Sequence, residues 1–275
     1  MANIHPTAIV HPKAQIGKNV VIDAYAVIHS PNAILGDNVT IKSHVYLDGH
    51  TTIGKGTTIW PFASIGTRTQ DLKYQGEVTY VEIGERCQIR EYVTINGSCG
   101  EGTKVTVGNG CLIMAYCHVA HNCSIGDGVI MSNGATLAGH VTVGNHAVLG
   151  GVCALHQHTR IGDFAMVGGG SMVGQDLPPF CMGTGFPLRV VGLNLIGLKR
   201  HKFSLEQRKQ LIRAYRLTYQ SGLSWKEAKG QIYAEMLPNE YLDTWVQFCD
   251  QTTRGISSLR RKRGALVLEP DLVEV

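Results

Sequence analysis

Histidines in the middle of the chain are the residues best suited to chemistry. His118 and His121 lie in the segment CHVAHNCSIG, His140 follows in LAGHVTVG, and His156 and His158 follow in LHQHTRIG. An imidazole titrates near neutral pH and can act as a general base, whereas three imidazoles with an open water position can hold zinc. Their spacing alone is compatible with either chemistry.

A six-residue period through the first two thirds of the chain decides where these histidines lie. Aliphatic residues keep this interval over one long uninterrupted run: Val107, Ile113, Val119, Ile125, Met131, Leu137, Val143, Leu149, Leu155, Ile161, Val167 and Val173. Earlier runs begin at Ile4, Leu35 and Ile83. A short strand and a tight turn in each repeat predict a triangular coil of about 18 residues, stacked on the next coil at about 4.8 Å. His121, His140 and His158 are spaced by about one coil, so we expect them to cluster along one face.

Two interruptions of the period, over residues 67–80 and 96–104, predict loops projecting from the stack, where function is commonly located. The period ends near Val173, and the segment DLPP at residues 176–179 is not expected to continue a strand ladder. The composition then changes. We therefore expect a β-helix over residues 1–190 and a helical domain over residues 191–275.

Helix signals support the second domain. Ser204 with Gln207, and Ser224 with Glu227, have the spacing of capping boxes. The first of these predicts a helix through Tyr219. A third helix is expected over about residues 239–251, followed by a basic, then apolar and acidic tail from residue 260 onward.

Composition narrows the class of protein. The net charge of +4 and the 17% of charged residues do not demand a nucleic-acid partner. No apolar run approaches the roughly 18 residues that would span a membrane, so we expect a cytoplasmic protein. The eight cysteines form no CxxC pair, and five are separated by multiples of six. These five are expected to share one repeating position as small buried hydrophobes: Cys87, Cys99, Cys111, Cys117 and Cys123.

Several segments resemble the bacterial UDP-N-acetylglucosamine O-acyltransferases, hexapeptide-repeat enzymes that begin lipid A biosynthesis. These segments are IHPTAIV, QDLKYQGE, HVAHNCSIG, ATLAGHVTVG, MVGGGS, QDLPP, GLNLIGLKR and TRGI. The resemblance covers nearly the full length and implies a left-handed parallel β-helix. It also implies transfer of a 3-hydroxyacyl group from acyl carrier protein to the 3-hydroxyl of UDP-N-acetylglucosamine. No cofactor is expected, because phosphopantetheine arrives on the carrier protein, and the family's homotrimer has each active site between two subunits.

The resemblance also assigns individual roles. His121 matches the general base, and Gly139 matches the residue whose backbone N–H stabilises the thioester oxyanion. Gly169 matches the end of the acyl groove, which implies a long chain, on the order of 14 carbons or more. The remaining matches are contacts to the sugar and phosphopantetheine arm (Asp71, Lys73), to the sugar nucleotide (His118, His140, His156, Gln157), and to the uracil and phosphates (Asn194, Arg200).

Three departures from the family pattern predict altered contacts. Ile196 replaces an acidic residue and His201 replaces an arginine, while residues 96–99 read NGSC in place of HRGT. Basic residues in the helical region would complement an acidic carrier protein: Lys199, Arg200, Lys202, Arg208, Lys209, Arg213 and Arg216.

Three other functions compete with this one. The related N-acyltransferase of the same pathway carries an extra N-terminal domain, whereas this repeat begins at Ile4. A zinc hydratase of the carbonic anhydrase type would use the histidines as metal ligands. A non-catalytic scaffold would leave the histidines and the QDLKY segment unexplained.

Overall fold

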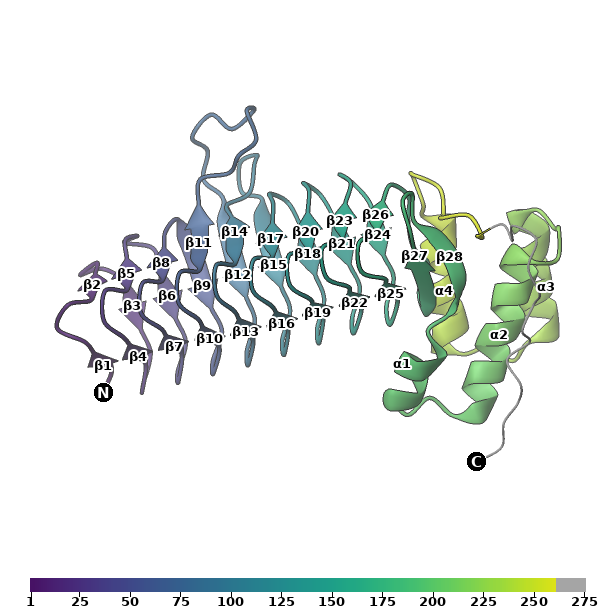
Figure 1. Ribbon diagram of the computed structural model, residues 1–275, viewed down its shortest axis with the longest axis horizontal. Coiled ribbons are helices and arrows are strands. Elements are labelled where there is room, and N and C mark those ends of the chain that lie inside the picture. Colours follow the sequence, from purple (N-terminus) through teal and green to yellow (C-terminus); the bar gives the residue numbers. More distant parts are fainter. Residues whose placement is uncertain (261–275) are drawn as a thin grey trace.

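The structure, a computed structural model, describes residues 1–260, so the tail predicted beyond them lies outside the described residues. A stack of triangular coils occupies the first two thirds of the chain, and each strand pairs in parallel with the equivalent strand of the next coil (Figure 1). Thr142 pairs with Arg160, for example, one 18-residue coil later. The six-residue period is therefore the side of a coil, as predicted, and the chain forms a left-handed parallel β-helix.

Three sheets form the sides of the coil, named A, B and C in the order in which the chain enters them. Sheet A contains β1 (Asn3–Ile4), β4 (Val21–Ile22), β7 (Thr40–Ile41), β10 (Thr58–Ile59), β13 (Gln88–Ile89), β16 (Leu112–Ile113), β19 (Ile130–Met131), β22 (Val148–Leu149), β25 (Met166–Val167), β27 (Cys181–Thr184) and β28 (Arg189–Leu193). Sheet B contains β2 (Ile9–Val10), β5 (Val27–Ile28), β8 (Tyr46–Leu47), β11 (Ser64–Thr67), β14 (Thr94–Asn96), β17 (His118–Val119), β20 (Thr136–Leu137), β23 (Ala154–Leu155) and β26 (Met172–Val173). Sheet C contains β3 (Gln15–Ile16), β6 (Ile34–Leu35), β9 (His50–Ile53), β12 (Tyr80–Ile83), β15 (Lys104–Val107), β18 (Ser124–Ile125), β21 (Thr142–Val143) and β24 (Arg160–Ile161). The turns from sheet A to sheet B form the A–B edge of the prism, and the B–C and C–A edges are defined in the same way.

The interior of the stack is filled by the aliphatic residues of the period. Ile113, Val119 and Ile125 occupy the three sides of one coil, and each is at most 2% exposed. Burying such a side chain contributes about 1.5–3 kcal/mol. Backbone hydrogen bonds run between coils, as from the His118 N–H to the Ala135 carbonyl oxygen at 3.0 Å. The stack is therefore held by burial within each coil and by hydrogen bonding to the next.

The cysteine prediction is confirmed at four of its five positions. Cys87, Cys111, Cys117 and Cys123 are buried in the stack. It was wrong for Cys99, which is only partly buried and follows β14 in an inserted loop. The period is interrupted there, so the spacing of Cys99 from the other cysteines has no structural meaning.

Both interruptions of the period are loops, as predicted. Loop 1 (residues 68–79) joins β11 to β12, and loop 2 (residues 97–103) joins β14 to β15. Figure 1 shows both projecting from the stack. The Gly100 N–H donates to Glu77 Oε1 at 2.7 Å, and the Gly102 N–H donates to the Val78 carbonyl oxygen at 2.8 Å. The two loops therefore support each other on the B–C edge.

The ladder continues past residue 176, so the prediction that DLPP would end it was wrong. Leu177 forms a parallel bridge with Ile161, and β27 pairs in parallel with β25. Both prolines come after Leu177 and before β27, in a turn whose residues donate no N–H to the ladder. β28 then returns antiparallel to β27 and ends at Leu193, just past the expected domain boundary at residue 190.

The QD and TRGI segments fasten the end of the chain onto the stack. The fully buried Asp176 accepts hydrogen bonds from the Arg160 N–H at 2.9 Å and from the Thr252 hydroxyl at 2.8 Å. Arg254 Nε donates to the Gly174 carbonyl oxygen at 3.0 Å. These contacts give both segments a structural role.

Helices follow the stack: α1 (Leu195–Arg200), α2 (Leu205–Tyr219), α3 (Trp225–Glu235) and α4 (Glu240–Asp250). Both predicted capping boxes are present, at Ser204 with Gln207 and at Ser224 with Glu227. Only α1 lacks a prediction from the sequence, because six residues carry too little periodicity. Among residues 1–260, no helix is long and apolar enough to cross a membrane.

Candidate active site

The histidine cluster predicted from the spacing is present on the B–C edge. His121, His140 and His158 occupy successive turns, with ring centroids 5.2 Å apart for the first pair and 4.4 Å apart for the second. The rings of His140 and His158 are nearly parallel, at 15°. Both residues have a φ angle of 62°, a left-handed turn conformation in which histidine is among the commoner side chains.

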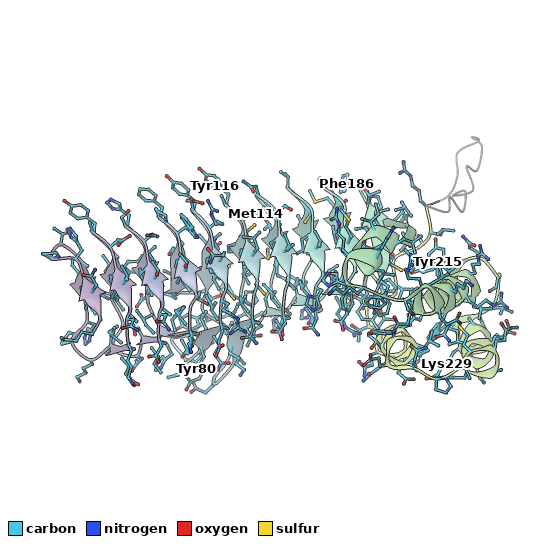
Figure 2. The ribbon with its side chains drawn as sticks, turned by 90° about the horizontal axis from the view of Figure 1, so that it is seen from below. Tyr80, Met114, Tyr116, Phe186, Tyr215 and Lys229 are labelled. Atoms are coloured by element: carbon cyan, nitrogen blue, oxygen red, sulfur yellow. The ribbon has the colours of Figure 1, made fainter. Side chains whose placement is uncertain are left out.

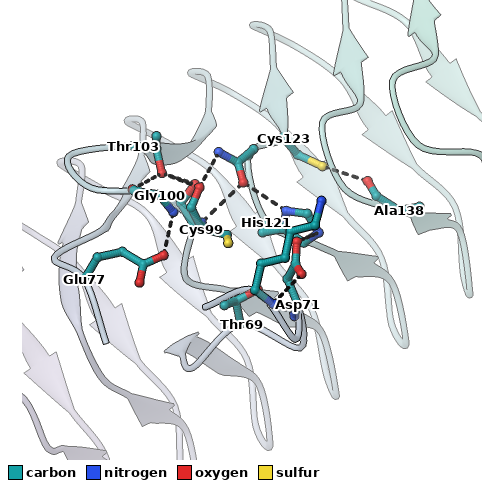
Figure 3. A network of polar contacts seen from close by, with 12 residues as sticks. Thr69, Asp71, Glu77, Cys99, Gly100, Thr103, His121, Cys123 and Ala138 are labelled. Atoms are coloured by element: carbon teal, nitrogen blue, oxygen red, sulfur yellow. Dashed lines mark hydrogen bonds and ion pairs between the residues drawn. The ribbon is translucent and has the colours of Figure 1, made fainter. Parts of the chain in front are cut away.

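His121 lies between two side-chain oxygens from different segments (Figure 3). Its Nε2 is 3.5 Å from Oδ2 of Asp71 in loop 1, and its Nδ1 is 2.9 Å from Oδ1 of Asn122. The side chains of His121 and Asp71 are only 9% and 20% exposed. Because an amide oxygen can only accept a hydrogen bond, this contact assigns a proton to Nδ1 and, in the neutral ring, the lone pair to Nε2.

Loop 2 fixes the orientation of the Asn122 amide. Asn122 Oδ1 accepts from the Cys99 N–H at 3.2 Å, and Asn122 Nδ2 donates to the Cys99 carbonyl oxygen at 3.0 Å. Loop 2 therefore holds the residue that orients His121. Sequence reasoning missed Asn122, since asparagine also occupies left-handed turn positions far from the site, at Asn19 and Asn38.

Loop 1 presents Asp71 to the imidazole as a carboxylate. The pKa of Asp71 is lowered, chiefly because the Lys73 backbone N–H donates to its Oδ1 at 2.9 Å, and further by the positive charges of His121 and Lys73. The Asp71 N–H donates to Thr69 Oγ1 at 3.2 Å. The Asp71 carboxylate therefore faces Nε2, the nitrogen at which a proton taken from a substrate would be held.

Gly139 lies directly against His121. A Cβ at residue 139 would lie 2.3 Å from both Cε1 and Nε2 of the ring, so no side chain fits there. The Gly139 carbonyl oxygen accepts from the His158 N–H at 3.2 Å, whereas its own N–H has no acceptor within residues 1–260. The geometry therefore allows this N–H to donate to a ligand close to the imidazole.

The other predicted histidines and their neighbours differ in exposure. His118 is half-buried, with Nδ1 2.7 Å from Thr94 Oγ1, and burial lowers its pKa. Burial and the neighbouring imidazoles lower the pKa of His140. His156, Gln157 and Lys73 are exposed.

Asn194 and Arg200 do not join this cluster within one chain. Asn194 is buried as the N-cap of α1, where its side chain accepts from the Gly197 N–H at 3.1 Å and donates to the Phe164 carbonyl oxygen at 2.9 Å. Its amide is thus engaged in packing. Arg200 is exposed at the end of α1. The next residue, His201, packs on His146 at 4.7 Å, which places this helix at the C–A edge and away from His121.

Two further observations delimit the site. A hollow of about 260 Å³ lies under loop 1, lined in part by Asp48, His50 and Tyr74, but His121 does not line it. Within the described residues, no three His, Cys, Asp or Glu side chains are arranged to hold a metal ion. The zinc alternative therefore finds no ligand set in the described part of one chain.

Comparisons with known proteins identify the family to which the chain belongs. The family model for UDP-N-acetylglucosamine O-acyltransferase domain 2 matches residues 176–257, and the bacterial transferase hexapeptide model matches residues 32–67 and 104–139. An acyl-[acyl-carrier-protein]–UDP-N-acetylglucosamine O-acyltransferase of Chlamydia caviae is 51% identical over 93% of this chain and 92% of its own length. Its namesake from Myxococcus xanthus is 43% identical over 94% of this chain and 100% of its own length.

Solved structures give the same result. A UDP-N-acetylglucosamine acyltransferase from Bacteroides fragilis superposes with a TM-score of 0.89 at 38% identity, covering 92% of this chain and 99% of its own. One from Arabidopsis superposes with a TM-score of 0.79 at 31% identity, covering 94% and 100%. The chain therefore belongs to the family of acyl-[acyl-carrier-protein]–UDP-N-acetylglucosamine O-acyltransferases.

Proposed function

We propose that this enzyme transfers a 3-hydroxyacyl group from acyl carrier protein to the 3-hydroxyl of UDP-N-acetylglucosamine, the first step of lipid A biosynthesis. One observation carries the assignment of the base: His121 has a carboxylate at Nε2, an amide oxygen at Nδ1 and the Gly139 backbone against its ring. The names of the relatives support the two substrates.

In the proposed reaction, Nε2 of His121 accepts the proton of the sugar hydroxyl while that oxygen attacks the thioester carbonyl carbon. The Gly139 N–H donates to the oxyanion of the tetrahedral intermediate. As the C–S bond breaks, the imidazolium returns the proton to the leaving phosphopantetheine sulfur. Asp71 and Asn122 stabilise the imidazolium between these two proton transfers.

The helical region is the proposed docking surface for the acidic carrier protein. Lys199, Arg200, Lys202 and Arg216 are exposed on or beside α1 and α2. Arg213 is exposed as well, but it is paired with Glu235 at 2.6 Å, which reduces its value for a partner. A cationic surface of this kind accelerates encounter with an acidic protein and weakens as salt is added.

We propose a homotrimer because, within one chain, the residues assigned to the sugar and to the diphosphate lie on different edges of the prism. His121 is on the B–C edge, whereas α1, which carries Arg200, packs at the C–A edge. Figure 1 shows α1 on the opposite side of the molecule from the loops. A diphosphate extending from a sugar at His121 would therefore meet Arg200 from a second copy of the chain.

Acyl transfer from a panel of 3-hydroxyacyl carrier proteins to UDP-N-acetylglucosamine tests this function. We expect the wild type to form the 3-O-acyl product and His121→Ala to reduce kcat by at least about 100-fold. Near wild-type turnover by His121→Ala would remove it as the base. Stoichiometric zinc that is required for activity would contradict the metal-free mechanism.

A further inference from the structure

Loop 1 and loop 2 are joined by a reciprocal pair of carboxylate contacts. Glu77 of loop 1 accepts from the Gly100 N–H of loop 2 at 2.7 Å, and Glu101 of loop 2 accepts from the Val78 N–H of loop 1 at 3.1 Å. The Gly102 N–H donates to the Val78 carbonyl oxygen at 2.8 Å. These five residues form a clasp that fixes the position of one loop relative to the other.

The clasp leads directly into the strands that follow the two loops. The Tyr80 N–H, at the start of β12, donates to the Thr103 carbonyl oxygen at 3.0 Å, and Tyr80 pairs with Lys104 of β15. Figure 2 shows Tyr80 on the side of the stack opposite Tyr116, which lies on the A–B edge. Sheet C therefore anchors the C-terminal ends of both loops next to the clasp.

Glu77 uses both of its carboxylate oxygens. Oε1 binds the Gly100 N–H, and Oε2 accepts from the Gln75 N–H at 2.8 Å. The Glu77 carbonyl oxygen accepts from the Tyr74 hydroxyl at 3.1 Å. The donated N–H groups, that of Gly100 foremost, lower the pKa of Glu77, so its side chain is a carboxylate at neutral pH. Glu77 therefore ties the conformation of loop 1 to the position of loop 2 through charge-assisted hydrogen bonds.

A closed path of contacts runs from the clasp through the candidate site and back. Loop 2 holds the Asn122 amide through the N–H and the carbonyl oxygen of Cys99. Asn122 Oδ1 is 2.9 Å from His121 Nδ1, and His121 Nε2 is 3.5 Å from Asp71 Oδ2. Asp71 and Glu77 both belong to loop 1. The path therefore passes through both nitrogens of the imidazole, and Glu77 closes it.

Loop 2 reaches the candidate site with its backbone rather than with a side chain. Both of its contacts to Asn122 come from the Cys99 main chain, which cannot adjust by a change of rotamer. The next N–H along the chain is that of Gly100, which Glu77 binds. Burial, and then the charges of Asp71 and Glu77, raise the pKa of the Cys99 thiol, so both carboxylates lie close to this residue. Glu77 thus fixes the loop at the peptide group adjacent to the Asn122 contact.

We propose that Glu77 is a positioning residue for acyl transfer, because it closes the path that holds Asp71 and Asn122 at the imidazole. It acts through the two loops and not on the substrate. This inference rests on the proposed function, since it concerns the base that is assigned there. Loss of Glu77 would release both neighbours of the imidazole together, and a displacement of about 1 Å at a catalytic group can cost about 100-fold in rate.

Steady-state kinetics of acyl transfer by two Glu77 variants test the proposal. Glu77→Ala should lower kcat about 10- to 100-fold. Glu77→Gln keeps an oxygen acceptor for the Gly100 N–H and should recover most of this loss. Glu82→Ala is the matched control, because it removes a carboxylate that joins β12 to β15 beyond the loops, where it binds Lys104 at 2.9 Å. It should leave kcat unchanged.

The same substitution in an Asn122→Ala background separates positioning from a general structural effect. The closed path is already open there, so Glu77→Ala should lower kcat by less than about threefold. Equal fold losses in the two backgrounds, or near wild-type kcat in Glu77→Ala, would overturn the proposal. Absence of transfer by the wild type with every donor, or wild-type kcat in His121→Ala, would instead contradict the proposed function.

Discussion

Gly139→Ala is the sharpest test of the candidate site, because one methyl group is placed against one ring. The new Cβ would lie 2.3 Å from Cε1 and Nε2 of His121, whereas carbon atoms normally pack at about 3.5–4.0 Å. The imidazole must therefore shift by more than about 1 Å, leaving Asp71 and Asn122. A misplacement of this size costs about 100-fold in rate. Overpacking of a fitted site costs about 1–3 kcal/mol of stability.

The assays are steady-state kinetics and urea unfolding on Gly139→Ala, His121→Ala and the double variant. The Gly139 backbone is not in the left-handed region, so alanine is strained only by the ring. The ring is absent in the His121→Ala background, so Gly139→Ala should there cost no more than about 0.5 kcal/mol of stability. The difference between its costs in the two backgrounds is the coupling free energy of the two sites, which should therefore be large. Gly192→Ala is the control, because nothing lies within 4 Å of its added Cβ. An equal stability loss in both backgrounds would refute the contact.

Four further predictions concern separate features of the molecule. Asn122→Ala removes the acceptor at His121 Nδ1 and should lower kcat of acyl transfer about 10- to 100-fold. Asn122→Asp keeps an acceptor oxygen and should lower kcat less than tenfold in the same assay. Asp176→Ala leaves a buried N–H unpaired and should cost about 1–3 kcal/mol in urea unfolding without changing KM. Burial, and to a lesser extent the neighbouring His146 imidazole, lowers the pKa of His201 in the folded protein. His201 therefore contributes its full stabilisation at pH values above its unfolded pKa of about 6.5, and this stabilisation is lost as the pH falls. His201→Phe should reduce the fall in the urea midpoint on acidification. Gly169→Met should shorten the preferred acyl chain, since the added Cβ is 3.3 Å from the Gly151 carbonyl oxygen and the residue is otherwise exposed; an unchanged preference would end the assignment of Gly169 as a length determinant.

The sequence predicts the stack well because a coil is a local, repeated structure. Inward positions recur every six residues, so Val119 and Leu137 could be placed without knowing any long-range contact. The same regularity predicted the contact of His140 with His158. It failed where the period is broken. Cys99 kept the numerical spacing by chance, inside a loop that the period does not describe.

The wrong prediction for the DLPP segment has another physical cause, which is competition between a local signal and tertiary contacts. The prolines after Leu177 suggested the end of the ladder, yet Leu177 bridges to Ile161 and β27 pairs with β25. The buried Asp176 carboxylate binds Thr252 of the returning C-terminal segment at this point. The nucleotide contact of Asn194, which its motif implies, stays a prediction. Its motif did not predict the intramolecular contacts of the same amide, which caps α1 and binds the Phe164 carbonyl oxygen, because only the folded chain brings these partners together.

Regular coils alone could not have built the candidate site. A strict repeat places each outward side chain over its counterpart on the next coil, as it does for His140 and His158. It has no means of bringing a carboxylate to the nitrogen of an imidazole. Loop 1 does so by carrying Asp71 from an earlier coil to His121 Nε2, and loop 2 holds Asn122 at Nδ1 through the Cys99 backbone. The Glu77 contact to Gly100 joins the two loops, so a change in the length of either should alter both sides of the imidazole together.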